Sequence, residues 1–319
     1  MIKKLWNFLK TLFSKQSQQS NIEELDSGIS IDQLILNAKA GDAEAQYNLG
    51  VCYETGDCIE QDIKQALYWY QKSVEQDFAL AKYALSKMYA EGNCVEQDFA
   101  KAIPMMQEAA EAGVNAAIYG MGMAYQYGRH VEANLAEAMK WYQLGAVKGD
   151  SACQCNLGAL YVRDDDKRDL DLALKWITKS AEQKWPLGLY NLGYIHDALL
   201  EDTKENKVKA LSNYILAARR GEPNAHFRLG LFYANGNQAV QKDRAKAFSY
   251  FLYAAQNEIA RAQTLVGIHY INGDGVEKDE ASGLIWLHHA IKNGDSLAQT
   301  TLSELGYEIT SEGYTATNS

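Results

Sequence analysis

Apolar and polar positions alternate along this chain in one recurring pattern. Seven times a leucine, methionine or valine is followed by a glycine or serine, with a tyrosine or histidine three positions further on. The small residues of these phrases are Gly50, Ser86, Gly122, Gly158, Gly193, Gly230 and Gly267. They are spaced by 35 to 37 residues. A period this regular predicts that one supersecondary unit is repeated along the chain.

Each repeat predicts two helices. In the first copy, apolar residues from Ala45 to Tyr53 fall on one helical face, and Gly56 stands where a left-handed residue would end the helix, which we name helix A. A second helix, helix B, begins after Asp62 and carries an apolar stripe from Ala66 to Val74. Two helices of this length cannot bury both stripes alone, so neighbouring repeats must stack. The pattern predicts an all-α fold, an α-solenoid of about seven antiparallel helix pairs.

The glycines inside helix A also need an explanation. A glycine within a helix costs about 1 kcal/mol relative to alanine. We therefore expect each one to allow close approach of helix B, together with alanines such as Ala66 and Ala102 on the partner helix.

The ends of the array differ from its middle. Residues 31–40 align with the end of a helix B and residues 296–305 with a helix A, so both predict capping helices of a solenoid over 31–305. Residues 15–30 read as a flexible polar linker and 306–319 as a short polar tail. Two repeats replace the glycine-rich loop with charged residues, at 164–169 and 201–207, where we expect longer, mobile loops.

Residues 1–14 predict a basic amphipathic helix. One apolar stripe contains Ile2, Leu5, Trp6, Leu9, Leu12 and Phe13, while Lys3, Lys4 and Lys10 lie away from it. The apolar run is too interrupted for a secretory signal and too short to span a bilayer. Three interpretations stay open: contact with a membrane surface, docking in a groove of a partner, or packing of the segment on its own array.

The repeat resembles the Sel-1-like repeat, a relative of the tetratricopeptide repeat. Residues 45–56 with 62–73, and the loop from Gly267 to Trp286, carry the resemblance, which covers about residues 41–298. It implies a right-handed superhelix and a role as an adaptor that binds a protein or peptide on its concave side. The positions that would face this groove are Tyr47, Val51, Glu54, Tyr83, Lys87, Ala90, Glu91, Tyr119, Met123, Gln126, Tyr127, Arg163, Tyr190, Tyr194, Asp197, Phe227, Leu231, Asn235, Ile268 and Asn272. Burial in the core would explain the aromatic members equally well.

Charge narrows the choice of partner. The net charge is −10, and because the first 20 residues hold four lysines and no acid, the rest of the chain carries all 41 acidic residues against 27 basic ones. Such a surface repels nucleic acid and favours a partner of basic character. The five cysteines cannot all pair within one chain, so we expect reduced thiols and a cytoplasmic protein, with a peripheral position on the inner face of a membrane as an option.

No motif for catalysis, a cofactor or a metal is present, and the histidines are scattered over different repeats. We therefore expect a scaffold, not an enzyme. Two alternatives stay open from the resemblance: an enzyme of the penicillin-binding or hydrolase kind, as in cysteine-rich relatives, and an exported host-interaction protein.

Overall fold

A computed structural model describes residues 30–163, 169–310 and 313–316. The chain divides into two compact units, Met1–Lys148 and Gly149–Ser319, and we describe each by itself. The predicted amphipathic helix at 1–14 and the linker at 15–30 fall, apart from Ser30, outside the described residues.

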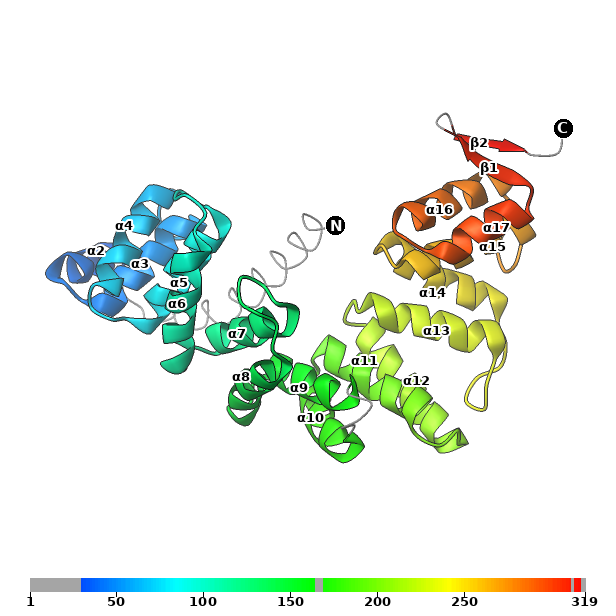
Figure 1. Cartoon of the computed structure of the whole chain (residues 1–319), viewed down its shortest axis with the longest axis horizontal. Helices are drawn as coiled ribbons and strands as arrows, with labels where there is room; N and C mark the ends of the chain where they lie inside the picture. Colours follow the sequence, from blue (N-terminus) through cyan, green and yellow to red (C-terminus); the bar gives the residue numbers. More distant parts are fainter. Residues whose placement is uncertain (1–29, 164–168, 311–312, 317–319) are drawn as a thin grey trace. The chain divides into compact units, whose positions relative to one another are not determined.

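The N-terminal unit is a run of α-helices that pack in chain order (Figure 1). Helix α2 caps the first pair, and the helices A and B of three pairs follow. The bounds are α2 (Ile31–Ala40), α3 (Ala43–Thr55), α4 (Ile63–Val74), α5 (Ala79–Glu91), α6 (Phe99–Glu111), α7 (Asn115–Tyr127) and α8 (Leu135–Val147).

The C-terminal unit continues the same alternation with four pairs, a last single helix and a short hairpin. Its helices are α9 (Ser151–Arg163), α10 (Leu170–Glu182), α11 (Pro186–Tyr194), α12 (Lys204–Ala218), α13 (Pro223–Asn235), α14 (Arg244–Gln256), α15 (Ala260–Asn272), α16 (Glu280–Lys292) and α17 (Ser296–Glu304). A π-helix, η1 (Ile195–Leu199), extends α11. The all-helical solenoid of stacked pairs that the sequence predicts is confirmed.

Local sequence sets the helix ends. The side chain of Asp62 accepts hydrogen bonds from the backbone N–H groups of Lys64 and Gln65 and so caps α4. Gly56 ends α3 in the left-handed conformation, with φ of 77°. Equivalent caps recur in most pairs and keep most helices close to 13 residues, whereas α11 has 9 residues and α12 has 15.

Glycine sets the spacing between the helices of a pair. A Cβ built on Gly50 would lie 2.6 Å from the ring of Tyr70 in α4, and one on Gly193 would lie 2.8 Å from the ring of Tyr214 in α12. Both rings are fully buried. Close helix approach therefore requires the glycines, as predicted.

The last residues form structure that the sequence analysis did not assign. Strands β1 (Tyr307–Thr310) and β2 (Gly313–Ala316) pair antiparallel, and the Tyr307 hydroxyl donates a hydrogen bond of 2.7 Å to Glu280 of α16. This contact attaches the hairpin to the last helix pair.

One loop prediction was wrong. We expected a polar, mobile loop over 201–207, but residues 204–207 form the first turn of α12. The Thr203 side chain caps this turn, and the Lys207 ammonium is held by Asp197, so the segment has tertiary partners that a reading of local polarity misses. Residues 164–168 of the other charged loop lie outside the described residues.

Candidate functional site

The candidate site is the set of groove positions predicted on the first helix of each pair, which we call the helix A face. In the N-terminal unit its members differ widely in exposure. Tyr47 and Tyr83 are only 8% and 9% exposed, and Tyr47 belongs to the core between α3, α4 and α5, so both offer little surface to a partner. Tyr127 at the end of α7 is 53% exposed. The half-buried members are Val51, Glu54, Lys87, Ala90, Glu91, Tyr119, Met123 and Gln126.

In the C-terminal unit most members are half-buried. These are Tyr190, Tyr194 and Asp197 around α11, Phe227 and Leu231 on α13, and Ile268 on α15. Arg163, Asn235 and Asn272, at the ends of their helices, are exposed. Half-buried aromatic side chains keep part of their surface available while the remainder packs on the neighbouring helix.

Three polar members of the face have internal partners. The buried tyrosine of helix B donates its hydroxyl hydrogen to Glu54 in the first pair, to Gln126 in the third and to Asp197 in the fifth, at 2.5, 2.7 and 3.2 Å. The tyrosines are Tyr70, Tyr142 and Tyr214. A buried hydroxyl needs such an acceptor, so these side chains have a structural role whether or not they also meet a partner.

In the other pairs, the position of the acceptor on helix A and the position of the buried tyrosine on helix B both hold apolar residues. The second pair has Ala90 with Met106, the fourth Val162 with Ile177, the sixth Ala234 with Phe251 and the seventh Ile271 with Leu287. A polar acceptor thus occurs on helix A in the pairs that have a tyrosine at this one helix B position, and an apolar residue occurs in the pairs that do not. This pattern is expected, because a buried tyrosine hydroxyl needs a hydrogen-bond acceptor and a buried apolar side chain does not.

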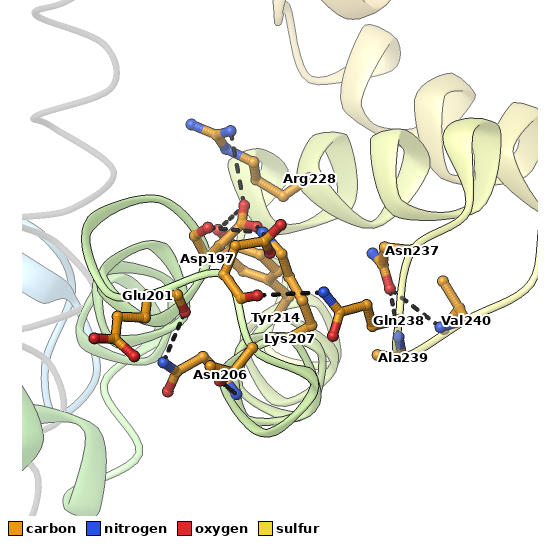
Figure 2. Close-up of polar contacts among 12 residues, drawn as sticks. Asp197, Glu201, Asn206, Lys207, Tyr214, Arg228, Asn237, Gln238, Ala239 and Val240 are labelled. Carbon is orange, nitrogen blue, oxygen red and sulfur yellow. Dashed lines mark hydrogen bonds and ion pairs between the residues drawn. The ribbon is translucent and has the colours of Figure 1, made fainter.

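Asp197 lies at the centre of the largest polar cluster drawn in Figure 2. Its Oδ1 atom accepts a hydrogen bond of 2.9 Å from the Lys207 ammonium, and its Oδ2 atom accepts the one from Tyr214. The Arg228 guanidinium, from α13, lies 4.0 Å from Oδ2. The side chains of Asp197 and Lys207 are 13% and 16% exposed, so this ion pair is largely removed from water.

The π-helix explains how a short side chain reaches this place. Aspartate is one methylene shorter than the Glu54 and Gln126 that hold the equivalent position, and here η1 replaces the ordinary end of helix A. A π-turn shifts the backbone within a helix and often occurs at functional sites. In this pair it lets Asp197 contact Tyr214 and Lys207 together.

Comparison with known proteins now identifies the repeat. The sequence profile of the Sel1 repeat matches residues 43–78, 79–114, 115–150, 151–185, 186–222, 223–258 and 260–295, which together make up most of the chain. The chain belongs to the Sel1 repeat family. Proteins built from Sel1 repeats are generally protein-interaction scaffolds.

Solved structures of Sel1 repeat proteins share this fold. A Sel1 repeat protein from Oxalobacter formigenes aligns with a TM-score of 0.69 and 26% identity over 86% of this chain and 79% of its own. The protein c5321 of uropathogenic Escherichia coli, described as a protective antigen displaying an SLR fold, aligns with a TM-score of 0.51 and 24% identity over 88% of this chain and 83% of its own. The search of curated proteins returned no significant match.

Two members of the Asp197 cluster were not found from the sequence. Lys207 was assigned to a loop. Arg228 directly precedes the repeat leucine Leu229, and the groove positions that the resemblance implied did not include it. Charge alone could have drawn attention to Arg228, because the equivalent positions elsewhere hold uncharged residues such as Asn191 and Leu265.

The described part of the chain offers no other chemical centre. Within it, no three side chains of His, Cys, Asp or Glu converge as metal ligands would, and no helix has the length and apolar character needed to cross a bilayer. Cys52, Cys153 and Cys155 are buried, and burial raises the pKa of the Cys155 thiol to about 12. Cys58 and Cys94 are exposed and unpaired by disulfide.

Proposed function

We propose that this Sel1 repeat protein is a non-catalytic scaffold that binds a peptide or protein segment along its helix A face. The observation that carries the proposal is the series of partly exposed aromatic and apolar residues contributed by the first helix of successive pairs, among them Tyr119 and Tyr127 in one unit and Tyr190, Tyr194 and Phe227 in the other. Aromatic side chains supply much of the binding energy in protein interfaces, since they bury a large surface at a small cost in conformational entropy.

The chemistry of the partner follows partly from charge. The net charge of −10 favours encounter with a segment of basic character. In the N-terminal unit, Glu91 and Glu54 are half-buried on the helix A face, and Glu54 already accepts the hydrogen bond from Tyr70. A basic side chain of the partner would therefore meet carboxylates whose positions the fold has fixed.

Selection from a library of random dodecapeptides displayed on phage, with the full chain immobilised, tests the proposal. Peptides should be enriched, and Tyr127→Ala should weaken their binding, because this side chain is more than half exposed on the face. The matched control is Tyr68→Ala, since Tyr68 is similarly exposed, at 48%, but belongs to helix B. Failure to enrich any peptide, or equal effects of the two substitutions on peptides bound by the N-terminal unit, contradicts the proposal.

We further propose that residues 2–13 bring the scaffold to a membrane surface. This rests on the sequence, in which one apolar stripe with Trp6 and Phe13 is accompanied by Lys3, Lys4 and Lys10. Flotation with anionic liposomes should carry the full chain to the lipid layer, whereas a chain that starts at Ser30 should stay below. Equal distribution of the two chains would refute membrane contact.

A further inference from the structure

The two units differ in the charge of the helix A face. In the N-terminal unit the face carries Glu54 and Glu91 beside Lys87. In the C-terminal unit it carries Arg163 and Asp197, and Arg228 adjoins it. The average charge of the chain therefore does not describe the C-terminal unit's part of the face.

Both carboxylate oxygens of Asp197 already accept hydrogen bonds within the protein. One of its oxygens is bound by Lys207 and the other by Tyr214. The Lys207 ammonium also donates to the backbone oxygen of Asp197 at 2.9 Å and lies 3.2 Å from Asp202, so its three donors are occupied as well. The Lys207 ammonium thus neutralises the carboxylate of Asp197, and it has no hydrogen-bond donor left for a ligand.

Arg228 remains incompletely paired. Its guanidinium is 4.0 Å from Asp197, beyond hydrogen-bond distance, and lies 5.0 Å from the ring centre of Tyr194. Burial lowers the pKa of Arg228, but interactions with Tyr190, Tyr214 and Asp197 raise it overall, so the side chain stays charged. Figure 2 shows one guanidinium nitrogen turned toward Asp197 and another directed away from the cluster.

The surroundings of Arg228 hold the guanidinium in place. The side chain is 28% exposed, which leaves part of the fork accessible. The ring of Tyr190, which interacts with Arg228, lies 5.9 Å, centre to centre, from the buried ring of Tyr214 and is therefore positioned by the core. A guanidinium that is already oriented loses little conformational entropy when it binds a ligand.

We propose that Arg228 binds a carboxylate of the partner segment, an inference that rests on the proposed scaffold function. The planar fork of arginine matches the two oxygens of a carboxylate. Tyr190 and Tyr194 beside it offer apolar surface to the residue next to that carboxylate. A group with a single negative charge fits better than a doubly charged phosphate, because Asp197 lies close to the same guanidinium.

The test uses the peptides that the library selection yields and the full chain. Among peptides whose binding is weakened by Tyr194→Ala, we expect an Asp, a Glu or a free C-terminus to recur next to an aromatic or aliphatic residue. Replacing the acid by its amide, or amidating the C-terminus, should weaken binding to the wild-type chain about tenfold, the size expected for loss of a charged hydrogen bond. The two kinds of peptide separate a side-chain carboxylate from a terminal one.

Arg228→Gln should abolish that tenfold preference, and Arg228→Lys should retain part of it, because the charge remains while the fork is lost. Arg220→Gln is the matched control, because Arg220 is an exposed arginine in the turn after α12, and it should leave the preference unchanged. Thermal denaturation followed by circular dichroism checks that each variant is folded.

The outcomes distinguish the two proposals. Enriched peptides that show no acidic preference, or a preference that survives Arg228→Gln in a folded chain, overturn the assignment of Arg228 and leave the scaffold function standing. Absence of any enriched peptide contradicts the scaffold function, and the assignment of Arg228 fails with it.

Discussion

The tyrosine and acceptor pairs make a quantitative prediction about the core. Tyr70 is fully buried, and its hydroxyl donates to Glu54 at 2.5 Å. Burial, followed by the charge and hydrogen bond of Glu54, raises the pKa of Tyr70 well above its usual range, so the hydroxyl stays protonated and needs an acceptor. Glu54→Ala removes that acceptor and should cost about 1–3 kcal/mol, the penalty for a buried polar group without a partner.

The reciprocal change should be milder. Tyr70→Phe leaves Glu54 half-buried, where water can reach its carboxylate, and should cost about 0.5–1.5 kcal/mol. The double variant Glu54→Ala/Tyr70→Phe recreates the pair that the sixth repeat already uses, Ala234 with Phe251. It should therefore lose less stability than the sum of the single variants.

The assay is urea denaturation of all four chains, monitored by circular dichroism and evaluated as a double-mutant cycle. We expect a coupling energy of about 1 kcal/mol or more, since the residues are in direct contact. A Glu54→Ala chain as stable as wild type, or a double variant whose loss equals the sum of the two single losses, would refute the matched-pair explanation.

Three other predictions follow from packing and burial. Gly158→Ala should lower stability by about 1–3 kcal/mol in the same assay, because its Cβ would lie 2.5 Å from buried Ile177 and this overpacking outweighs the helix propensity of alanine. A thiol reagent such as Ellman's reagent should modify two of the five cysteines in the folded chain, exposed Cys58 and Cys94, and the others only after denaturation. Burial lowers the pKa of His226 in the folded chain. The contribution of His226 to stability is therefore present above the pKa that this histidine has in the unfolded chain, and it is lost as the pH falls below that value. His226→Phe should reduce the drop in melting temperature between pH 7 and pH 5.

The fold was predictable because its determinants are local and repeated. The spacing of the glycines, a cap such as Asp62 and a left-handed Gly56 specify helix lengths and turns within a few residues of themselves. Because the same sequence pattern occurs in seven consecutive copies, the apolar stripes are buried when neighbouring helix pairs stack on one another. Where the local phrase is absent, at 201–207 and at 306–316, the prediction gave loop or tail, and the structure has the start of α12 and a hairpin.

The candidate site was less predictable, because its properties depend on pairings between repeats. The sequence placed Asp197 among the groove positions, where its carboxylate would favour a basic ligand. In the structure, Lys207 and Tyr214 donate hydrogen bonds to the two oxygens of that carboxylate. Those contacts depend on the π-helix at Ile195–Leu199, which no local sequence pattern predicted. Once Asp197 is satisfied internally, the charge left for a ligand is that of Arg228, and the sign of the local electrostatic preference reverses relative to the net charge of the chain. Net charge can therefore indicate how a partner is attracted from a distance, whereas the hydrogen bonds between repeats decide which group it must present at contact.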